Sequence, residues 1–312
     1  MPDAAAAMTL ATHRIAVLTP DPADASYAGL WPRVLARLQG ALARHGIEAE
    51  PTAWTVHADD PAALAGYRLV LPLLAWGYHL DHARWLRACA AWERAGVPMA
   101  NPAEVLAWNS DKRYLATLAG RGVPVPATTV IEGGVRAADL EAAFAATGAQ
   151  ALIVKPAVSG GAWRTLRIAR GEDLGAALAD AAPGDGSTGQ AMLVQPYLPT
   201  IEREGETSLL YFGGRLSHVV NKRPPDGEFR VQEQFGGRYA PIHPPRGALV
   251  LAEQVLAAID APLLYARIDT VPDAGGRWLL MEAELIEPDF YLGVDPAAGD
   301  GFARAVAARL AA

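Results

Sequence analysis

A lysine beside a run of small residues is the first combination in this sequence that could bind phosphate. Lys155 ends the apolar run 151–154 and is followed by Ser159, Gly160 and Gly161. The lysine ammonium group and the N–H groups of such a loop can both donate hydrogen bonds to phosphate oxygens. The alternative is a lysine at the end of a strand beside an ordinary Ser-Gly turn. Walker A spacing and the Gly-x-Gly-x-x-Gly pattern are absent, which argues against a P-loop NTPase or a Rossmann dehydrogenase.

Three carboxylates in the last third of the chain form a second combination. Glu282 and Glu284 are two residues apart in an apolar strand, so both side chains point to the same face of a sheet. Asp269, in the preceding strand, joins them if the two strands form a hairpin. Converging carboxylates are costly unless a cation neutralises them, and Mg²⁺ suits oxygen ligands together with phosphate. The alternative is a solvated acidic face, but the surrounding leucines argue against it.

Four cationic residues, Lys222, Arg223, Arg230 and Arg267, form the third feature. Surface charge is the ordinary role of such residues. Arg267 differs, because it alternates in phase with Asp269 and therefore shares its face of the strand. An arginine beside a cation site can stabilise negative charge that develops on a transferred group.

The elements that must position these residues begin with alternating strands and helices. Apolar runs at 15–18 and 69–74 alternate with helical patterns over 28–44 and 81–95. This alternation indicates β-α-β units and a parallel sheet. Ligands of such sheets meet the carboxyl ends of the strands.

The segment after the second apolar run is therefore a candidate for substrate binding. Trp76 and Tyr78 follow this inner strand and are candidates for substrate contacts. His79 and His82 flank Asp81, and for them we expect surface or capping roles rather than metal binding.

The rest of the chain is expected to form an α+β segment followed by an antiparallel sheet. A single helix is expected to end at Gly120 or Gly122 and to carry Trp108, Asn109, Lys112 and Tyr114. The Gly-rich, charged segment 226–239, which contains Arg230, is typical of a long functional loop. The strands that we expect cover residues 128–131, 151–154, 165–169, 192–198, 208–212, 216–221, 265–270 and 278–285, and the helices 136–147, 172–182 and 247–259.

Composition excludes several classes of protein. The chain has 312 residues, of which 51% are hydrophobic and 20% are charged, so it is not disordered overall. A net charge of −7 without a basic run gives no sign of nucleic-acid binding. The single cysteine, Cys89, is expected in a helix core. No apolar run reaches the roughly 18–20 residues that span a bilayer. We expect a cytoplasmic protein without a membrane partner, with residues 1–12 as a flexible tail.

The order of these segments resembles the ATP-grasp superfamily. The resemblance runs from Asn109 to Asp289, and its specificity lies in the ordered set rather than in any one piece. The pieces are Asn109-Ser110-Asp111-Lys112, Val154-Lys155-Pro156 with Ser159-Gly160-Gly161, Val194-Gln195-Pro196-Tyr197-Leu198, Glu206-Thr207-Ser208, Arg267-Ile268-Asp269 and Met281-Glu282-Ala283-Glu284. The resemblance implies an α/β fold with an α+β lid. A Rossmann-like N-terminal domain (13–108) would precede two α+β subdomains that clamp ATP, a lid with the helix that leads into it (109–195) and a C-terminal subdomain (196–312).

The resemblance also implies a role for each side chain of an ATP site. The residues that would contact or close over the phosphates are Lys112, Lys155, Ser159, Gly160 and Gly161. Gln195, Tyr197 and Leu198 would receive adenine through main-chain groups. Glu206 would bind the ribose hydroxyls, with Glu202 as the alternative because this loop is long.

The implied metal site is made of the three carboxylates. Asp269, Glu282 and Glu284 would bind Mg²⁺, with Mn²⁺ as a second candidate. Arg267 and Lys222 would face the transferred phosphoryl group. Many members have Glu-x-Asn where this chain has Glu-x-Glu, which alters the charge at the metal but keeps an oxygen ligand there.

Three segments are similar to the stand-alone ATP-grasp ligases of the cycloserine-biosynthesis type. They are Trp108-Asn109-Ser110-Asp111-Lys112-Arg113-Tyr114-Leu115, Gly227-Glu228-Phe229-Arg230-Val231-Gln232 and Glu284-Leu285-Ile286-Glu287-Pro288. This similarity implies an ATP-dependent ligase of antibiotic biosynthesis that activates a carboxylate as an acyl phosphate, releases ADP and forms a C–N bond with an amine. Arg230 would bind the acyl phosphate or the substrate carboxylate, and Glu287 and Asp289 would meet a substrate amino group.

Whether such an enzyme cyclises one small amino-acid-like molecule or couples two stays open at this point. The rival interpretations are an ATP-binding sensor or scaffold without turnover and a carboxylate kinase of the same fold. Retention of three carboxylates and both lysines argues against a sensor. The partners are then small-molecule carboxylates and amines, and a homodimer is the commonest oligomer among soluble proteins.

Overall fold

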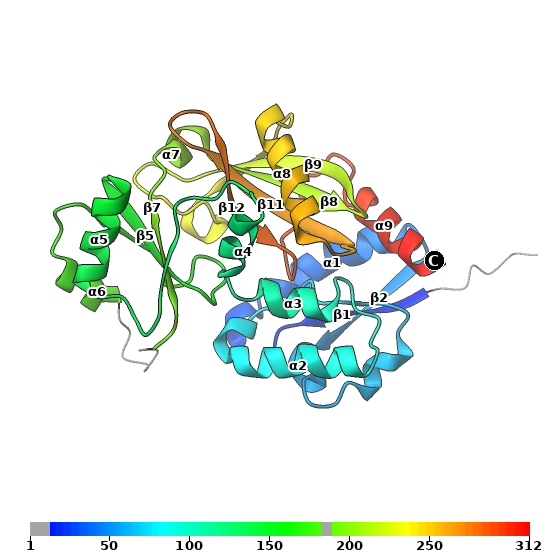
Figure 1. Cartoon of the computed structure of the whole chain (residues 1–312). Helices are drawn as coiled ribbons and strands as arrows, with labels where there is room; N and C mark the ends of the chain where they lie inside the picture. The colour runs from blue at the N-terminus through cyan, green and yellow to red at the C-terminus, as the bar shows by residue number, and fades with distance from the viewer. Residues whose placement is uncertain (1–12, 182–188) are drawn as a thin grey trace, which may run out of the picture.

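In the computed structural model, three sheets joined by helices form the framework of the described part of the chain (Figure 1). The structure describes residues 13–181 and 189–312, so the tail expected over residues 1–12 lies outside the described residues. Within these two ranges, no helix is long and apolar enough to cross a membrane.

The first sheet is parallel and has the strand order β2-β1-β3, as the alternating pattern predicts. Its strands and the helices around it are β1 (His13–Thr19), β2 (Ile47–Ala53), β3 (Val70–Leu71), α1 (Trp31–Ala43), α2 (His82–Arg94) and α3 (Ala103–Asn109). Strand β2 was not expected, since its apolar residues alternate with glutamates instead of forming a run. Ile47 and Ala49 are buried while Glu48 is exposed, as befits an edge strand with one solvated face.

The second sheet is antiparallel, has the order β4-β7-β5-β6 and forms the expected α+β segment. Its elements are β4 (Thr129–Ile131), β5 (Ala151–Pro156), β6 (Leu166–Ala169), β7 (Met192–Pro196), α5 (Ala137–Thr147) and α6 (Leu174–Ala181). Leu140 and Phe144 of α5 pack against Leu152 and Val154 of β5. One face of this sheet is therefore covered by a helix.

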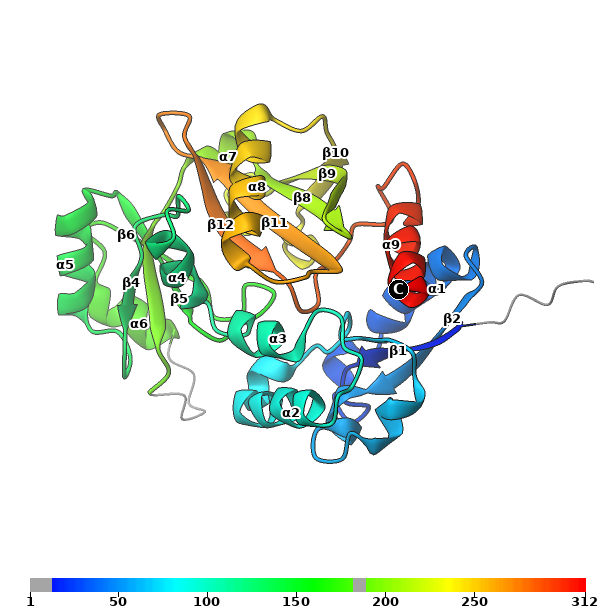
Figure 2. The ribbon, with the colours of Figure 1, turned by 45° about the vertical axis from the view of Figure 1, so that its right-hand side comes forward.

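The third sheet is antiparallel and has the order β10-β9-β8-β11-β12. Its elements are β8 (Glu206–Phe212), β9 (Arg215–Arg223), β10 (Arg238–Pro241), β11 (Tyr265–Pro272), β12 (Trp278–Glu284), α4 (Tyr114–Gly120), α7 (Thr200–Glu204) and α8 (Arg246–Ile259). Helix α8 lies across one face (Figure 2), where Leu251 and Val255 pack with Ile268 and Leu280. Side chains in the opposite phase of β11 and β12, including those of Arg267 and Asp269, therefore face away from α8.

The single helix expected from Trp108 to Gly120 is wrong. The structure has two helices, because α3 ends at Asn109 and α4 begins at Tyr114. Between them the main-chain N–H of Lys112 donates to the carbonyl of Ala157, 2.8 Å away on a distant segment. This long-range bond cannot be inferred from local helix propensity, and it turns Lys112 toward the second sheet. The loop expected over 226–239 also ends earlier, because β10 begins at Arg238.

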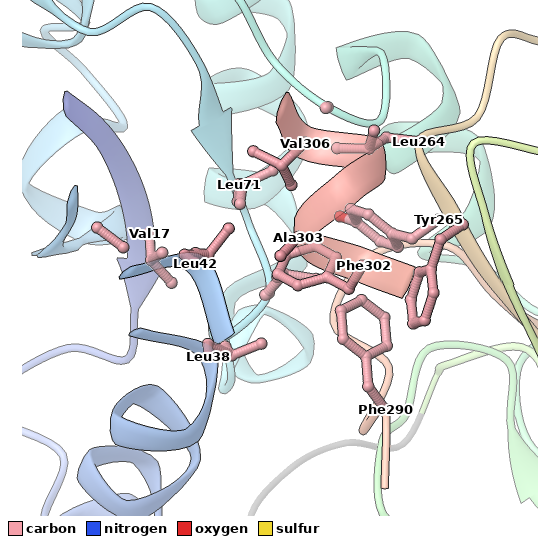
Figure 3. Packing of buried hydrophobic residues seen from close by; sticks show 14 of the residues in the cluster. Val17, Leu38, Leu42, Leu71, Leu264, Tyr265, Phe290, Phe302, Ala303 and Val306 are labelled. Carbon is pink, nitrogen blue, oxygen red and sulfur yellow. The ribbon is translucent and has the colours of Figure 1, made fainter. Parts of the chain in front are cut away.

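The two ends of the described chain share one hydrophobic core (Figure 3). Helix α9 (Asp300–Ala311) places Phe302 and Val306 among side chains of the first sheet, such as Val17 and Leu71. Phe302 also contacts Phe290, which follows β12, with ring centroids 5.0 Å apart. This core joins the first sheet to the segment after β12, which includes Phe290 and Tyr291.

Candidate active site

A cavity of about 740 Å³ lies where the three sheets meet. Side chains from β5, β7, β8, β9, β11 and β12 line it, together with those of two loops and the segment after β3. Every site residue that the sequence nominated lines this cavity, except the alternative ribose ligand Glu202. This cavity is therefore the candidate active site.

The hairpin expected for the three carboxylates is present. Strands β11 and β12 are antiparallel, and their register places Asp269 opposite Glu282 and Arg267 opposite Glu284. Asp269 is also opposite Ser208 of β8, whose hydroxyl donates to its Oδ1. The period-two alternation of the strands thus brings three carboxylates and an arginine to one face of the sheet.

Cationic side chains neutralise these carboxylates. Arg267 forms ion pairs with both Asp269 and Glu284, and the Lys222 ammonium group lies 3.1 Å from Asp269. Burial acts to raise the pKa of Asp269, but Arg267 and Lys222 outweigh it and lower this pKa to about 2. Lys222 also pairs with Glu206, its neighbour across β8 and β9.

Glu282 lies close to the two lysines that are expected to bind phosphate. The ammonium groups of Lys155 and Lys112 lie 3.2 and 3.7 Å from its Oε1. Burial opposes ionisation, yet the two lysines lower the pKa of Glu282 to about 2. Glu284 differs, because burial raises its pKa to about 7 despite the nearby Arg267.

The donor chemistry at this face fits a hard divalent cation. Three carboxylates lie on one face of the sheet, and burial followed by the charges of Asp269 and Glu282 raises the pKa of Glu284 despite Arg267, so an added cation would favour its ionised form. Among the residues that the structure describes, no three acidic, histidine or cysteine side chains already surround a common point at metal-binding distances. Lysine and arginine groups lie between these carboxylates instead, so a cation would have to displace them.

The loop after β5 contacts Lys112 and the segment that follows β3. Lys112 donates to the carbonyl of Ser159 over 2.6 Å, and the Ser159 hydroxyl donates to the carbonyl of Pro156. Gly161 has φ +57°, a conformation that favours glycine. Further along the loop, the ring of Trp163 packs on His79 with centroids 5.5 Å apart. The loop thus lies against the segment between α3 and α4 and against the segment after β3.

The surface or capping role expected for His79 is wrong, because this histidine is buried and lines the cavity. Burial, followed by the positive charge of Lys112, lowers the pKa of His79 to about 4. Asp81 does cap α2, accepting from the N–H of Arg84, and His82 pairs with Ser110. Cys89 lies in the core as expected.

The far end of the cavity has the groups expected around a nucleotide base and ribose. The side chain of Gln195 donates to Thr128, and the main-chain N–H of Tyr197 donates to Ala151. The Tyr197 hydroxyl donates to Glu202 over 2.6 Å, and the guanidinium of Arg167 stacks on the Tyr197 ring. Glu202 is thereby engaged outside the cavity, whereas Glu206 lines it.

Arg230 lines the cavity from the loop after β9, and neighbours in that loop restrain it. Its guanidinium pairs with Glu228 at 2.7 Å and lies over the ring of Phe235, 3.7 Å from the centroid. Its hydrogen bonds lower the pKa of Glu228 to about 2. A ligand anion would therefore compete with Glu228 for Arg230.

Further aromatic side chains, among which Tyr239 and Tyr291 were not foreseen from the sequence, line the end of the cavity that we expect to take the substrate. Tyr27 packs on Trp76 with ring centroids 5.6 Å apart, and Tyr239 packs on Tyr291 at 4.9 Å. The Tyr291 ring also lies under Arg267, 5.2 Å from its guanidinium carbon. These aromatic residues belong to no motif, and only the position of Tyr291 shortly after a functional strand could have drawn attention to it. Tyr78 and Asp289 line the same region.

Glu287 stands at this end as well. Burial, and then the nearby Glu284, raise the pKa of Glu287 to about 8. A carboxyl group in such surroundings is poised to gain from a cationic ligand group, because an added positive charge favours its ionised form.

Comparisons with known proteins agree with this architecture. A family model described as "D-cycloserine synthetase DcsG, N-terminal domain" matches residues 15–101. The cycloserine biosynthesis protein DcsG of Streptomyces lavendulae is 30% identical over 284 residues, which cover 85% of this chain and 90% of the relative. The crystal structure of D-cycloserine synthetase DcsG has a TM-score of 0.79 at 29% identity, covering 95% of this chain and 99% of that chain.

A more distant similarity extends the fold comparison. The crystal structure of D-alanine–D-alanine ligase from Bacillus anthracis has a TM-score of 0.72 at 15% identity and covers 96% of each chain. This match shows a shared fold. Together the comparisons confirm the ATP-grasp architecture and the resemblance on which the sequence analysis relied. The chain belongs to the ATP-grasp ligases of the cycloserine-biosynthesis type and is an ATP-dependent carboxylate–amine ligase that forms C–N bonds.

Proposed function

We propose that this ligase activates the carboxylate of a small amino-acid-like substrate as an acyl phosphate. The γ-phosphoryl group of ATP moves to a carboxylate oxygen, and ADP leaves. An amine nitrogen then attacks the acyl carbon, the C–O bond to phosphate breaks, and the nitrogen loses a proton. The observation that carries this proposal is the single cavity in which Lys112, Lys155, Lys222 and Arg267 surround three carboxylates.

The nucleotide would lie between the unit formed by residues 109–195 and the unit formed by residues 196–312. Lys112 and Lys155 would bind its phosphates, and the loop with Ser159, Gly160 and Gly161 would close over them. Its adenine would meet main-chain groups near Gln195, Tyr197 and Leu198 at the end of β7. Glu206 would bind the ribose, which is supported by its place in the cavity.

Asp269, Glu282 and Glu284 would bind Mg²⁺, or Mn²⁺ in its place. When bound, the cation supplies positive charge to the phosphate oxygens. Arg267 and Lys222 neutralise carboxylates in this structure, and both side chains would face the transferred phosphoryl group if those carboxylates held the cation. Catalysis then consists mainly of positioning and electrostatic stabilisation.

The substrate would occupy the aromatic end of the cavity. Arg230 would bind the acyl phosphate or the substrate carboxylate once it leaves Glu228. Glu287 and Asp289 would meet a substrate amino group beside Trp76 and Tyr78. The similarity to D-cycloserine synthetase supports cyclisation of one molecule rather than coupling of two.

The test is ADP release from Mg²⁺-ATP in the presence of pooled amino acids, amino-acid derivatives and small dipeptides. We expect one pool to stimulate release, and Glu282→Gln to abolish the stimulation without loss of fold. A cyclised product is lighter than its substrate by one water and needs no second substrate. ATP binding without ADP release from any pool would favour a sensor, and a stable phosphorylated product would favour a carboxylate kinase.

A further inference from the structure

Strand β12, which bears Glu282 and Glu284, is at the edge of its sheet. One side of it pairs with β11, in the register that sets Glu282 opposite Asp269. In an antiparallel pair the residue between two such partners directs its N–H and C=O groups outward. The outward groups here belong to Ala283, between the glutamates, and to Leu285, just after them. Buried main-chain groups of this kind need partners.

Two side chains from the segment between the first two sheets supply partners for three of these four groups, and Asn101 pairs with the fourth, the carbonyl of Leu285. The Asn109 side-chain amide donates to the carbonyl of Ala283 over 2.8 Å and accepts from the N–H of Leu285 over 2.9 Å. The Asn109 amide therefore makes the two hydrogen bonds that a peptide group of a neighbouring strand would make, and it bridges the residues on either side of Glu284. The Tyr114 hydroxyl accepts from the N–H of Ala283 over 2.9 Å. Asn109 is 7% exposed and Tyr114 is 4% exposed, so water cannot readily substitute for them.

The same segment also reaches the phosphate side of the cavity. Lys112 lies between Asn109 and Tyr114 in the chain, donates to the carbonyl of Ser159 and lies 3.7 Å from Glu282. Residues 109–114 thus contact two places, the main chain of β12 beside both glutamates and the loop expected to close over ATP.

We propose that Asn109 and Tyr114 are positioning residues that orient Glu282 and Glu284 for metal binding through the main chain of β12. The proposal rests on the proposed function, which makes these glutamates metal ligands. Partners that orient metal ligands typically change metal affinity by about 10–100-fold when they are removed. Neither residue touches the reacting atoms in this assignment; both act through the strand.

The test compares Asn109→Ala and Tyr114→Phe with a matched control, Asn101→Ala. Asn101 is a fully buried asparagine. Its side-chain amide donates to the carbonyls of Leu285 and Tyr265 and accepts from the N–H of Leu264. Its removal costs more hydrogen bonds than the removal of Asn109 does, but it leaves both groups of Ala283 and the N–H of Leu285 paired. Tyr114→Phe deletes only a hydroxyl and keeps the ring that packs on Trp108.

The main measurement is Mn²⁺ affinity, followed by electron paramagnetic resonance in the presence of the ATP analogue AMPPNP. We expect a loss of about 10–100-fold for Asn109→Ala, a smaller loss for Tyr114→Phe and less than a threefold change for Asn101→Ala. Hydrogen exchange of the Ala283 and Leu285 amides, measured without any ligand, should accelerate in the first two variants. In turnover, kcat should fall while KM for ATP stays within twofold.

Three results would overturn the proposal. Asn109→Ala and Tyr114→Phe with wild-type Mn²⁺ affinity would show that these contacts serve the fold alone. An equal loss in Asn101→Ala would mean general destabilisation. A wild-type protein that binds no Mn²⁺ with AMPPNP would overturn the metal part of the proposed function as well, whereas the first two results leave that function intact.

Discussion

Glu282→Gln separates the role that the structure shows for this side chain, a partner for two lysines, from the role that we propose for it, a ligand for a cation. Glutamine keeps the shape but removes the charge that now neutralises Lys112 and Lys155. The side chain of Glu282 is 27% exposed, and those of Lys112 and Lys155 are 13% and 9% exposed. Breaking a fully buried ion pair costs about 3–5 kcal/mol. Because this one is partly hydrated, we expect the free energy of unfolding to fall by about 2–3 kcal/mol.

The same substitution should strengthen binding of ATP when no metal is present. A lysine that contacts both a phosphate and the Glu282 carboxylate, each at about 3 Å, would place these two negative groups about 6 Å apart. Their repulsion costs on the order of 1–3 kcal/mol at an effective dielectric constant of about 20. Removing the carboxylate should therefore tighten metal-free ATP binding by about tenfold. Turnover with Mg²⁺ should nevertheless disappear, because a metal ligand is lost.

Three assays check these expectations, namely urea unfolding at pH 7.5, calorimetric titration with ATP in a chelator, and ADP release with Mg²⁺. Glu50→Gln is the matched control, since Glu50 pairs with Arg14 far from the cavity. That control should lose less than about 1 kcal/mol of stability and keep its activity. Full turnover by Glu282→Gln would refute the metal assignment, and weaker binding of metal-free ATP would refute the competition between carboxylate and phosphate.

Three further predictions concern other parts of the cavity. Lys155→Ala should weaken ATP binding by about 10–100-fold in calorimetry, and unchanged affinity would remove Lys155 from the site. Glu206→Gln should abolish discrimination between ATP and 2′-deoxy-ATP, while Glu202→Gln should preserve it; the opposite pattern would assign the ribose to Glu202. Because its folded-state pKa of about 4 lies below the ordinary 6.5, His79 contributes stability above pH 6.5 that is lost as the pH falls toward 4. His79→Gln should therefore reduce the drop in unfolding free energy between pH 7 and pH 5 by on the order of 2 kcal/mol, and an unchanged drop would contradict the neutral state.

The site was predictable where short sequence periods determine geometry. Glu282 and Glu284 share a face because strand side chains alternate, and the hairpin with β11 then brings Asp269 to them. Lys155 and its loop were predictable because a charged residue directly ends an apolar strand. In each case neighbouring residues and one strand pairing carry the information.

Long-range contacts explain what the sequence did not predict. The break between α3 and α4 depends on the hydrogen bond from the main-chain N–H of Lys112 to the carbonyl of Ala157. The position of α9 depends on Phe302, which packs with side chains of the first sheet that are more than 200 residues earlier in the sequence. Tyr239 and Tyr291 meet across two segments that have no shared pattern. The role of Asn109 at the edge of β12 is equally invisible without the fold.

The most direct test of carboxylate activation follows an oxygen atom. A substrate from the stimulating pool is labelled with ¹⁸O in its carboxylate, and the phosphate released with ADP is analysed by mass spectrometry. An acyl phosphate intermediate predicts that one labelled oxygen passes from the carboxylate to phosphate in each turnover. Unlabelled phosphate, or release of AMP and pyrophosphate instead of ADP, would contradict the account.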